Sequence, residues 1–70
     1  MQIIVFKTNL TDVKHISNIS SSLNIHPNIA KWNVDLNDCD NVLRIETNKL
    51  SPKEIESMLI HAGYFCEELQ

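Results

Sequence analysis

The spacing of the apolar residues switches back and forth along the chain between that of a strand and that of a helix, and this order constrains the fold most strongly. Residues 2–7, QIIVFK, carry β-branched and aromatic side chains on both pleat faces, which is typical of a strand inside a sheet. From about residue 10 to 23 the spacing of three and four residues places one set of side chains along one face of a helix: Val13, Ile16, Ile19, Ser20 and Leu23. We therefore expect a strand followed by a helix with one apolar face.

The middle of the chain reads as a β-hairpin. Pro27 stops the first helix, and KWNVDL at residues 31–36 then alternates strictly, with Trp32, Val34 and Leu36 on one face. The next five residues, NDCDN, are dense in turn formers, and VLRIE after them alternates again. Two antiparallel strands joined by a turn at Cys39 are expected here.

A second helix has the clearest start signal in the sequence. In LSPKEI, Ser51 is the expected N-cap, Pro52 takes the first helical position, and Glu54 completes a capping box. Gly63, the one glycine of the chain, is expected to end this helix in a left-handed conformation. YFCEEL at residues 64–69 then reads as the last strand.

The element order is strand, helix, strand, strand, helix, strand, and it predicts an α+β fold of the ferredoxin-like βαββαβ type. Residues 1–70 are expected to form one domain with a four-stranded antiparallel sheet in the order 4-1-3-2 and both helices on one face. This topology brings the KTNLTD loop at residues 7–12, the hairpin tip at Cys39 and the turn at Gly63 to one end of the molecule.

Composition excludes several function classes. Apolar residues make up 43% of the chain and charged residues 21%, as in ordinary globular proteins. A net charge of −3 and the lack of aromatics in VLRIE argue against nucleic-acid binding. The segment MQIIVFK has no long apolar core, so neither a signal peptide nor a membrane span is expected, and a cytoplasmic location is the default.

The element order, the WNVDL strand and the AGY turn after the second helix resemble the heavy-metal-associated domain of copper chaperones and metal-pumping ATPases. The resemblance implies a Met-x-Cys-x-x-Cys motif at the end of the first strand, where two thiolates bind a soft metal ion. In this chain the three motif positions fall on Lys7, Asn9 and Asp12. Neither an amide nor one carboxylate replaces a pair of thiolates for copper(I).

Asn9 and Asp12 are instead expected to cap the first helix, with Asn9 as the N-cap and Asp12 in the positive field of the helix dipole. A harder cation or an anion at this helix N-terminus is the alternative. Cys39 and Cys66 are expected to be free thiols, Cys66 buried and Cys39 exposed. No metal site is expected, and the weak candidates for one are Asn9, Asp12 and Cys39. No cofactor is expected, and no catalytic arrangement is recognisable.

The uncovered face of the sheet is the expected interaction surface, because every residue from Ile3 to Phe6 is apolar and one alternate pair must point away from the helices. The sequence leaves two choices, Ile4 with Phe6 or Ile3 with Val5. We take the following as interaction residues: Ile4, Phe6, Arg44 and Glu46. A protein partner or a second copy of the chain suits such a patch. The function expected is a non-enzymatic interaction or regulatory domain; the alternative is metal binding or transport through non-standard ligands.

Overall fold

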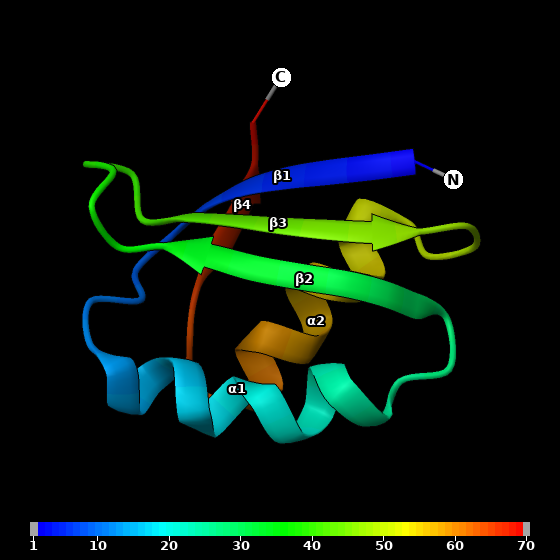
Figure 1. Ribbon diagram of the computed structural model, residues 1–70, viewed down its shortest axis with the longest axis horizontal. Coiled ribbons are helices and arrows are strands. Elements are labelled where there is room, and N and C mark those ends of the chain that lie inside the picture. Colours follow the sequence, from blue (N-terminus) through cyan, green and yellow to red (C-terminus); the bar gives the residue numbers. More distant parts are fainter. Residues whose placement is uncertain (1, 70) are drawn as a thin grey trace.

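The computed structural model describes residues 2–69, and its six elements follow the expected order. They are β1 (Gln2–Thr8), α1 (Val13–Ile25), β2 (Ile29–Asp35), β3 (Val42–Thr47), α2 (Pro52–His61) and β4 (Cys66–Glu68). The four strands form one antiparallel sheet in the order β2-β3-β1-β4, which confirms the expected topology. Both helices lie on the same side of the sheet (Figure 1). The fold is therefore a ferredoxin-like sandwich with one covered and one open sheet face.

The covered face of the sheet forms the core together with the helices. β1 pairs with β3 in a register that sets Ile4 opposite Ile45 and Phe6 opposite Leu43, and all four side chains are buried. Ile4 and Phe6 were expected on the open face, so this assignment is wrong. Since side chains alternate along a strand, burying this pair directs Ile3 and Val5 outward.

Helix α1 begins later than expected, at Val13, and it ends at Ile25. Its N-cap is Asp12 and not Asn9, because Asp12 has extended backbone angles and its side chain accepts a hydrogen bond from the N–H of Lys14. Val13, predicted on the apolar stripe, is 70% exposed, and Leu10 in the preceding loop is buried in its place. The loop therefore supplies one of the core side chains.

Helix α2 has the expected start and end. The Ser51 side chain accepts from the Glu54 N–H, and the Glu54 side chain accepts from the Ser51 N–H, so the capping box is complete. Gly63 follows the helix with φ of 94°, a conformation that costs little only without a side chain. β4 is shorter than expected, because Tyr64 and Phe65 connect α2 to the strand and do not pair with β1.

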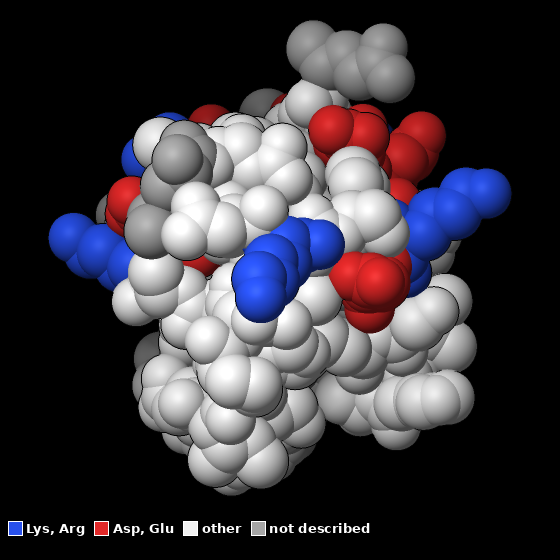
Figure 2. All heavy atoms as spheres, turned by 90° about the vertical axis from the view of Figure 1, so that its right-hand side faces the viewer, with Lys and Arg blue, Asp and Glu red and all other residues white. Residues whose placement is uncertain are grey.

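The end of the molecule where the chain passes from α1 to β2 carries basic and acidic side chains intermixed at the level of the sheet (Figure 2). The lower part of this surface, below the sheet, has no Lys, Arg, Asp or Glu (Figure 2). No basic patch of the kind that binds nucleic acid is visible on this side. Within residues 2–69, neither helix has the length and apolar character needed to cross a bilayer.

Candidate functional site

Three loops meet at one end of the sandwich, as the topology predicted. They are residues 8–12, which begin at the last residue of β1, residues 38–41 between β2 and β3, and residues 63–65 before β4, and we call them together the loop end (Figure 1). The N–H of Thr8 donates to the Asp40 carbonyl at 3.0 Å, and the N–H of Asn9 donates to the Phe65 carbonyl at 3.2 Å. Backbone hydrogen bonds therefore connect the loop after β1 to both of the other loops.

Thr8 holds the first part of this loop. Its side chain is 6% exposed; its hydroxyl donates to the Asn41 carbonyl at 2.6 Å and accepts from the Leu10 N–H at 3.1 Å. These bonds satisfy polar groups that the burial of Leu10 takes out of water. Thr8 therefore connects the loop after β1 to the loop between β2 and β3.

Asn9 and Asp12 use their side-chain oxygens within the chain. Asn9 Oδ1 accepts from the N–H of Phe65 at 2.8 Å, and Asp12 Oδ1 accepts from the N–H of Lys14 at 2.8 Å. Asn9 thus fixes the connection between α2 and β4, while Asp12 alone caps α1. The expected capping role therefore applies to Asp12, and Asn9 instead holds the connection before β4.

His15 completes the hydrogen bonding of this loop. Its Nδ1 accepts from the N–H of Thr11 at 3.1 Å, and its ring lies 5.1 Å from the ring of Tyr64. The Tyr64 hydroxyl in turn accepts from the side-chain amide of Asn18 at 2.7 Å. The imidazole therefore orients the loop and the turn before β4, and its Nδ1 lone pair is not free for an ion.

The two cysteines are in the expected states. Cys39 is a free, exposed thiol, and Cys66 is a free, buried one. Burial, and after it the carboxylate of Glu56, raises the pKa of the Cys66 thiol from 9.0 to about 12. Cys66 is therefore protonated and unreactive at neutral pH, and it serves as part of the core.

Residues 2–69 contain one group of three metal-ligating side chains whose donor atoms all lie within 4.8 Å of one another: Asp38, Cys39 and Asp40. Asp12 does not belong to it. The Asp38 carboxylate also accepts from the N–H of Asp40 at 2.9 Å, which is ordinary turn geometry. Sequence reasoning singled out Cys39 but treated the flanking acids only as turn formers, although the run Asp-Cys-Asp was the available signal.

The open face of the sheet is the second candidate region, and the register arranges it in rows. Arg44 on β3 lies between Val5 on β1 and Asn33 on β2. Glu46 likewise lies between Ile3 and Lys31. Arg44 and Glu46 are thus on the face where they were expected, beside the other apolar pair of β1.

Apolar side chains on this face lie toward β4. Ile3 is 58% exposed and Val5 is half-buried. The N–H of Leu69 donates to the Val5 carbonyl at 2.8 Å, which continues the pairing of β1 with β4 and sets Leu69, 37% exposed, beside Val5. An apolar strip with charged neighbours therefore runs along one side of the open face.

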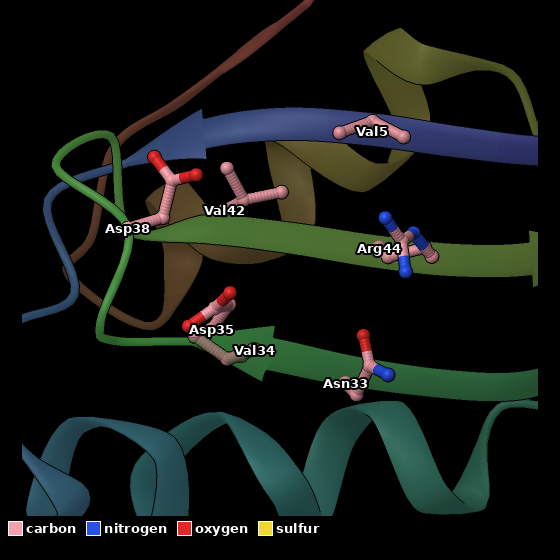
Figure 3. A pocket seen from close by; sticks show the side chains of 7 residues that line it. All are labelled: Val5, Asn33, Val34, Asp35, Asp38, Val42 and Arg44. Atoms are coloured by element: carbon pink, nitrogen blue, oxygen red, sulfur yellow. The ribbon is translucent and has the colours of Figure 1, made fainter.

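Toward β2 the same face is hollowed. The hollow has a volume of about 460 Å³ and is lined by Val5, Asn33, Val34, Asp35, Asp38, Val42 and Arg44. Figure 3 shows Arg44 and Asn33 toward one end, and Asp35 and Asp38 at the other end near the turn between β2 and β3. We call this feature the hollow. The acidic end of the hollow was not predicted from the sequence, because Asp38 was recognised there only as a turn former.

Comparison with known proteins establishes the fold. No known protein family matches the sequence, and no curated protein matches it. Solved structures do match: the Atx1-Cu(I)-Ccc2a complex gives a TM-score of 0.85 at 17% identity and covers 100% of this chain and 97% of that one.

Two further solved structures are similar to this chain over nearly its whole length. The N-terminal domain of PacS from Synechocystis gives a TM-score of 0.82 at 15% identity, with 100% of both chains covered. The apo HMA domain of a copper chaperone for superoxide dismutase gives 0.81 at 18% identity, with 97% of this chain and 66% of that one covered. The chain therefore has the fold of heavy-metal-associated domains, and at these identities the likeness extends to the fold alone.

Proposed function

We propose that this protein is a non-enzymatic binding module that contacts another protein through the open face of its sheet. The observation that carries the proposal is the state of Asn9 and Asp12, at the positions where the resembled family has its two thiolates. Each side chain has an oxygen that accepts a backbone hydrogen bond of 2.8 Å within the chain. These oxygens thus stabilise the loop itself, in the place where the resembled family holds a soft ion. The open face of the sheet is then the surface that we assign to binding.

The composition of the open face supports this proposal. Ile3, Val5 and Leu69 supply apolar surface next to charged side chains of both signs, including Arg44 and Glu46. Protein interfaces combine an apolar centre with a polar rim in this way. Exposed apolar side chains that lie side by side are also more informative than single ones, because isolated surface hydrophobics are common.

The fold neighbours give independent support for a protein partner. One of them was solved as the Atx1-Cu(I)-Ccc2a complex, so a domain of this fold is known in contact with a second protein. That complex holds copper(I), and the present proposal differs in assigning no ion to the loop after β1.

A site-specific crosslinking experiment tests the proposal. A benzophenone amino acid is placed at position 3, on the open face, or at position 21, an exposed serine on α1, and each protein is irradiated in an extract of its own cells. We expect adducts from position 3 that are absent from position 21. Sedimentation of the purified chain then shows whether the adduct is a second copy. A monomer that gives no adduct at position 3, or equal adducts at both positions, contradicts the proposal.

A second candidate function, metal binding, is favoured by one observation. Asp38, Cys39 and Asp40 bring three donor atoms within 4.8 Å of one another at the loop end. One thiolate with two carboxylates suits a borderline ion such as zinc better than copper(I). Titration with zinc, copper(I) and calcium tests this candidate, with Cys39→Ser as the variant. Stoichiometric binding tighter than about 1 μM that Cys39→Ser abolishes would favour metal binding over the first proposal.

A further inference from the structure

The hollow on the open face is electrostatically polarised. The Arg44 guanidinium, on an exposed side chain, marks one end, and the carboxylates of Asp35 and Asp38, both exposed, mark the other (Figure 3). Val5 pairs with Arg44 at the basic end and Val42 pairs with Asp35 at the acidic end, and both valines are half-buried. A ligand that fills the hollow therefore meets a cation beside one valine at one end, and two anions beside the other valine at the opposite end.

The spacing of these charges follows from the strand register. Arg44 pairs with Asn33, and two residues along the strands Val42 pairs with Asp35. Residues two apart on a strand face the same side and are separated by roughly 6.5 to 7 Å along it. An extended peptide has the same repeat, so its side chains i and i+2 reach the two ends of the hollow together.

We propose that the hollow binds an extended segment of a partner protein that carries an acidic and a basic side chain two residues apart. The acidic group lies against Arg44 and the basic group against Asp35 and Asp38. Charge complementarity and matched spacing support this binding mode. The inference rests on the proposed function and specifies its partner. The main chain of the segment then runs along β2 and β3.

A second copy of this chain fits the hollow less well. Two copies related by a two-fold axis that passes through the hollow would bring one hollow against the other, and a gap between them provides no dispersion contacts. An extended segment, in contrast, is narrow enough to enter a hollow of about 460 Å³ with its side chains. The occupant is therefore a convex or extended part of a different protein.

Short peptides test the charge pattern directly. The probe is a blocked pentapeptide with the centre Glu-Val-Lys, and the controls have the centres Glu-Val-Glu, Lys-Val-Lys and Gln-Val-Gln. Binding is followed by amide NMR shifts of the labelled full chain, which also locate the contact. We expect Glu-Val-Lys to bind about threefold to tenfold more tightly than every control, with shifts on β2 and β3 that weaken at high salt.

A charge reversal in the protein should change the preference. Arg44→Glu makes both ends of the hollow acidic, so this variant should lose its preference for Glu-Val-Lys and bind Lys-Val-Lys best. Lys49→Glu is the matched control, because Lys49 is an exposed cation outside the hollow and its reversal changes the net charge by the same amount. Equal binding of all four peptides, or an equal response of both variants, overturns the proposal.

The two proposals fail in different ways. If Arg44→Glu still forms the crosslinks at position 3 as the unaltered chain does, the open face binds a protein but the hollow does not select it, and only the present inference is wrong. If position 3 gives no crosslinks in the unaltered chain, the proposed function is wrong as well.

Discussion

The loop end and the open sheet face are both rich in polar and charged side chains, but they differ in how those side chains are used. At the loop end, Thr8, Asn9, Asp12 and His15 each make a hydrogen bond to the backbone of the same chain. On the open face, the Arg44 guanidinium lies across a hollow from the carboxylates of Asp35 and Asp38, which border the hollow although each also accepts a backbone N–H at 2.9 Å. The comparison teaches that polar side chains in a loop can serve the structure of that loop, while a sheet face without a recognisable motif can present charged groups around a hollow.

The largest expected effect separates the two faces of β1. Phe6→Ala should lower the free energy of unfolding by about 3 to 5 kcal/mol, because Phe6 is fully buried and its removal leaves a cavity. Ile3→Ala, on the open face at 58% exposure, should change it by less than about 1 kcal/mol. Urea unfolding of both variants measures the difference. Similar losses would mean that the open face is also part of the core.

Thr8→Val tests whether the loop end depends on its internal hydrogen bonds. Valine keeps the shape but leaves the buried N–H of Leu10 without an acceptor, so the free energy of unfolding should fall by about 2 kcal/mol. Thr11→Val is the control, since the Thr11 side chain is exposed and should contribute less than about 0.5 kcal/mol. An unchanged unfolding midpoint for Thr8→Val would show that water replaces the hydroxyl. The structure of the loop would then not depend on the hydrogen bonds of Thr8.

Asp12→Ala removes the N-cap of α1 and should cost about 1 kcal/mol. Asp12→Asn retains an oxygen acceptor at the same place and should cost much less. Thermal unfolding with and without added divalent cations measures both. If cations stabilise the unaltered chain and Asp12→Asn abolishes that effect, Asp12 is a metal ligand and the capping interpretation is insufficient.

The smallest effect at neutral pH concerns Cys66. Its pKa is about 12 in the folded chain against an ordinary value of 9.0, so the folded state holds the proton more tightly than the unfolded state. The contribution to stability is therefore complete below pH 9 and is lost as the pH rises from about 9 toward 12. Unfolding measured from pH 7 to 10.5 should show a steeper decline for the unaltered chain than for Cys66→Ala. Parallel curves would contradict the buried, protonated thiol.

Local signals were sufficient for much of the fold. The capping box at Ser51 and the turn at Gly63 are encoded within a few neighbouring residues, and both were predicted correctly. The start of α1 was not, since Asn9 and Asp12 are equally good N-caps by residue type. The choice of Asp12 depends on Asn9 binding Phe65, a residue 56 positions away that no local pattern connects to it.

The candidate site was predicted only in part. Arg44 and Glu46 were placed on the open face by the alternation of VLRIE, whose polar and apolar positions are distinct. The hollow could not be predicted, because it needs Asp38 from a turn beside Asp35 from β2 and Val5 from β1. Six of the seven lining residues come from residues 33–44, and the seventh, Val5, is distant in the sequence and is brought beside them by the register between β1 and β3.

The order of elements, the position of the second helix and the absence of a thiolate pair were determined by the sequence alone, because each depends on residue type and short-range spacing. Tertiary structure decided which side of β1 faces the solvent. The four residues Ile3, Ile4, Val5 and Phe6 are all apolar, so no alternation distinguishes them, and only pairing with Ile45 and Leu43 under the two helices fixes the choice. Side-chain direction in a strand repeats every two residues, and a uniformly apolar strand contains no information on its phase.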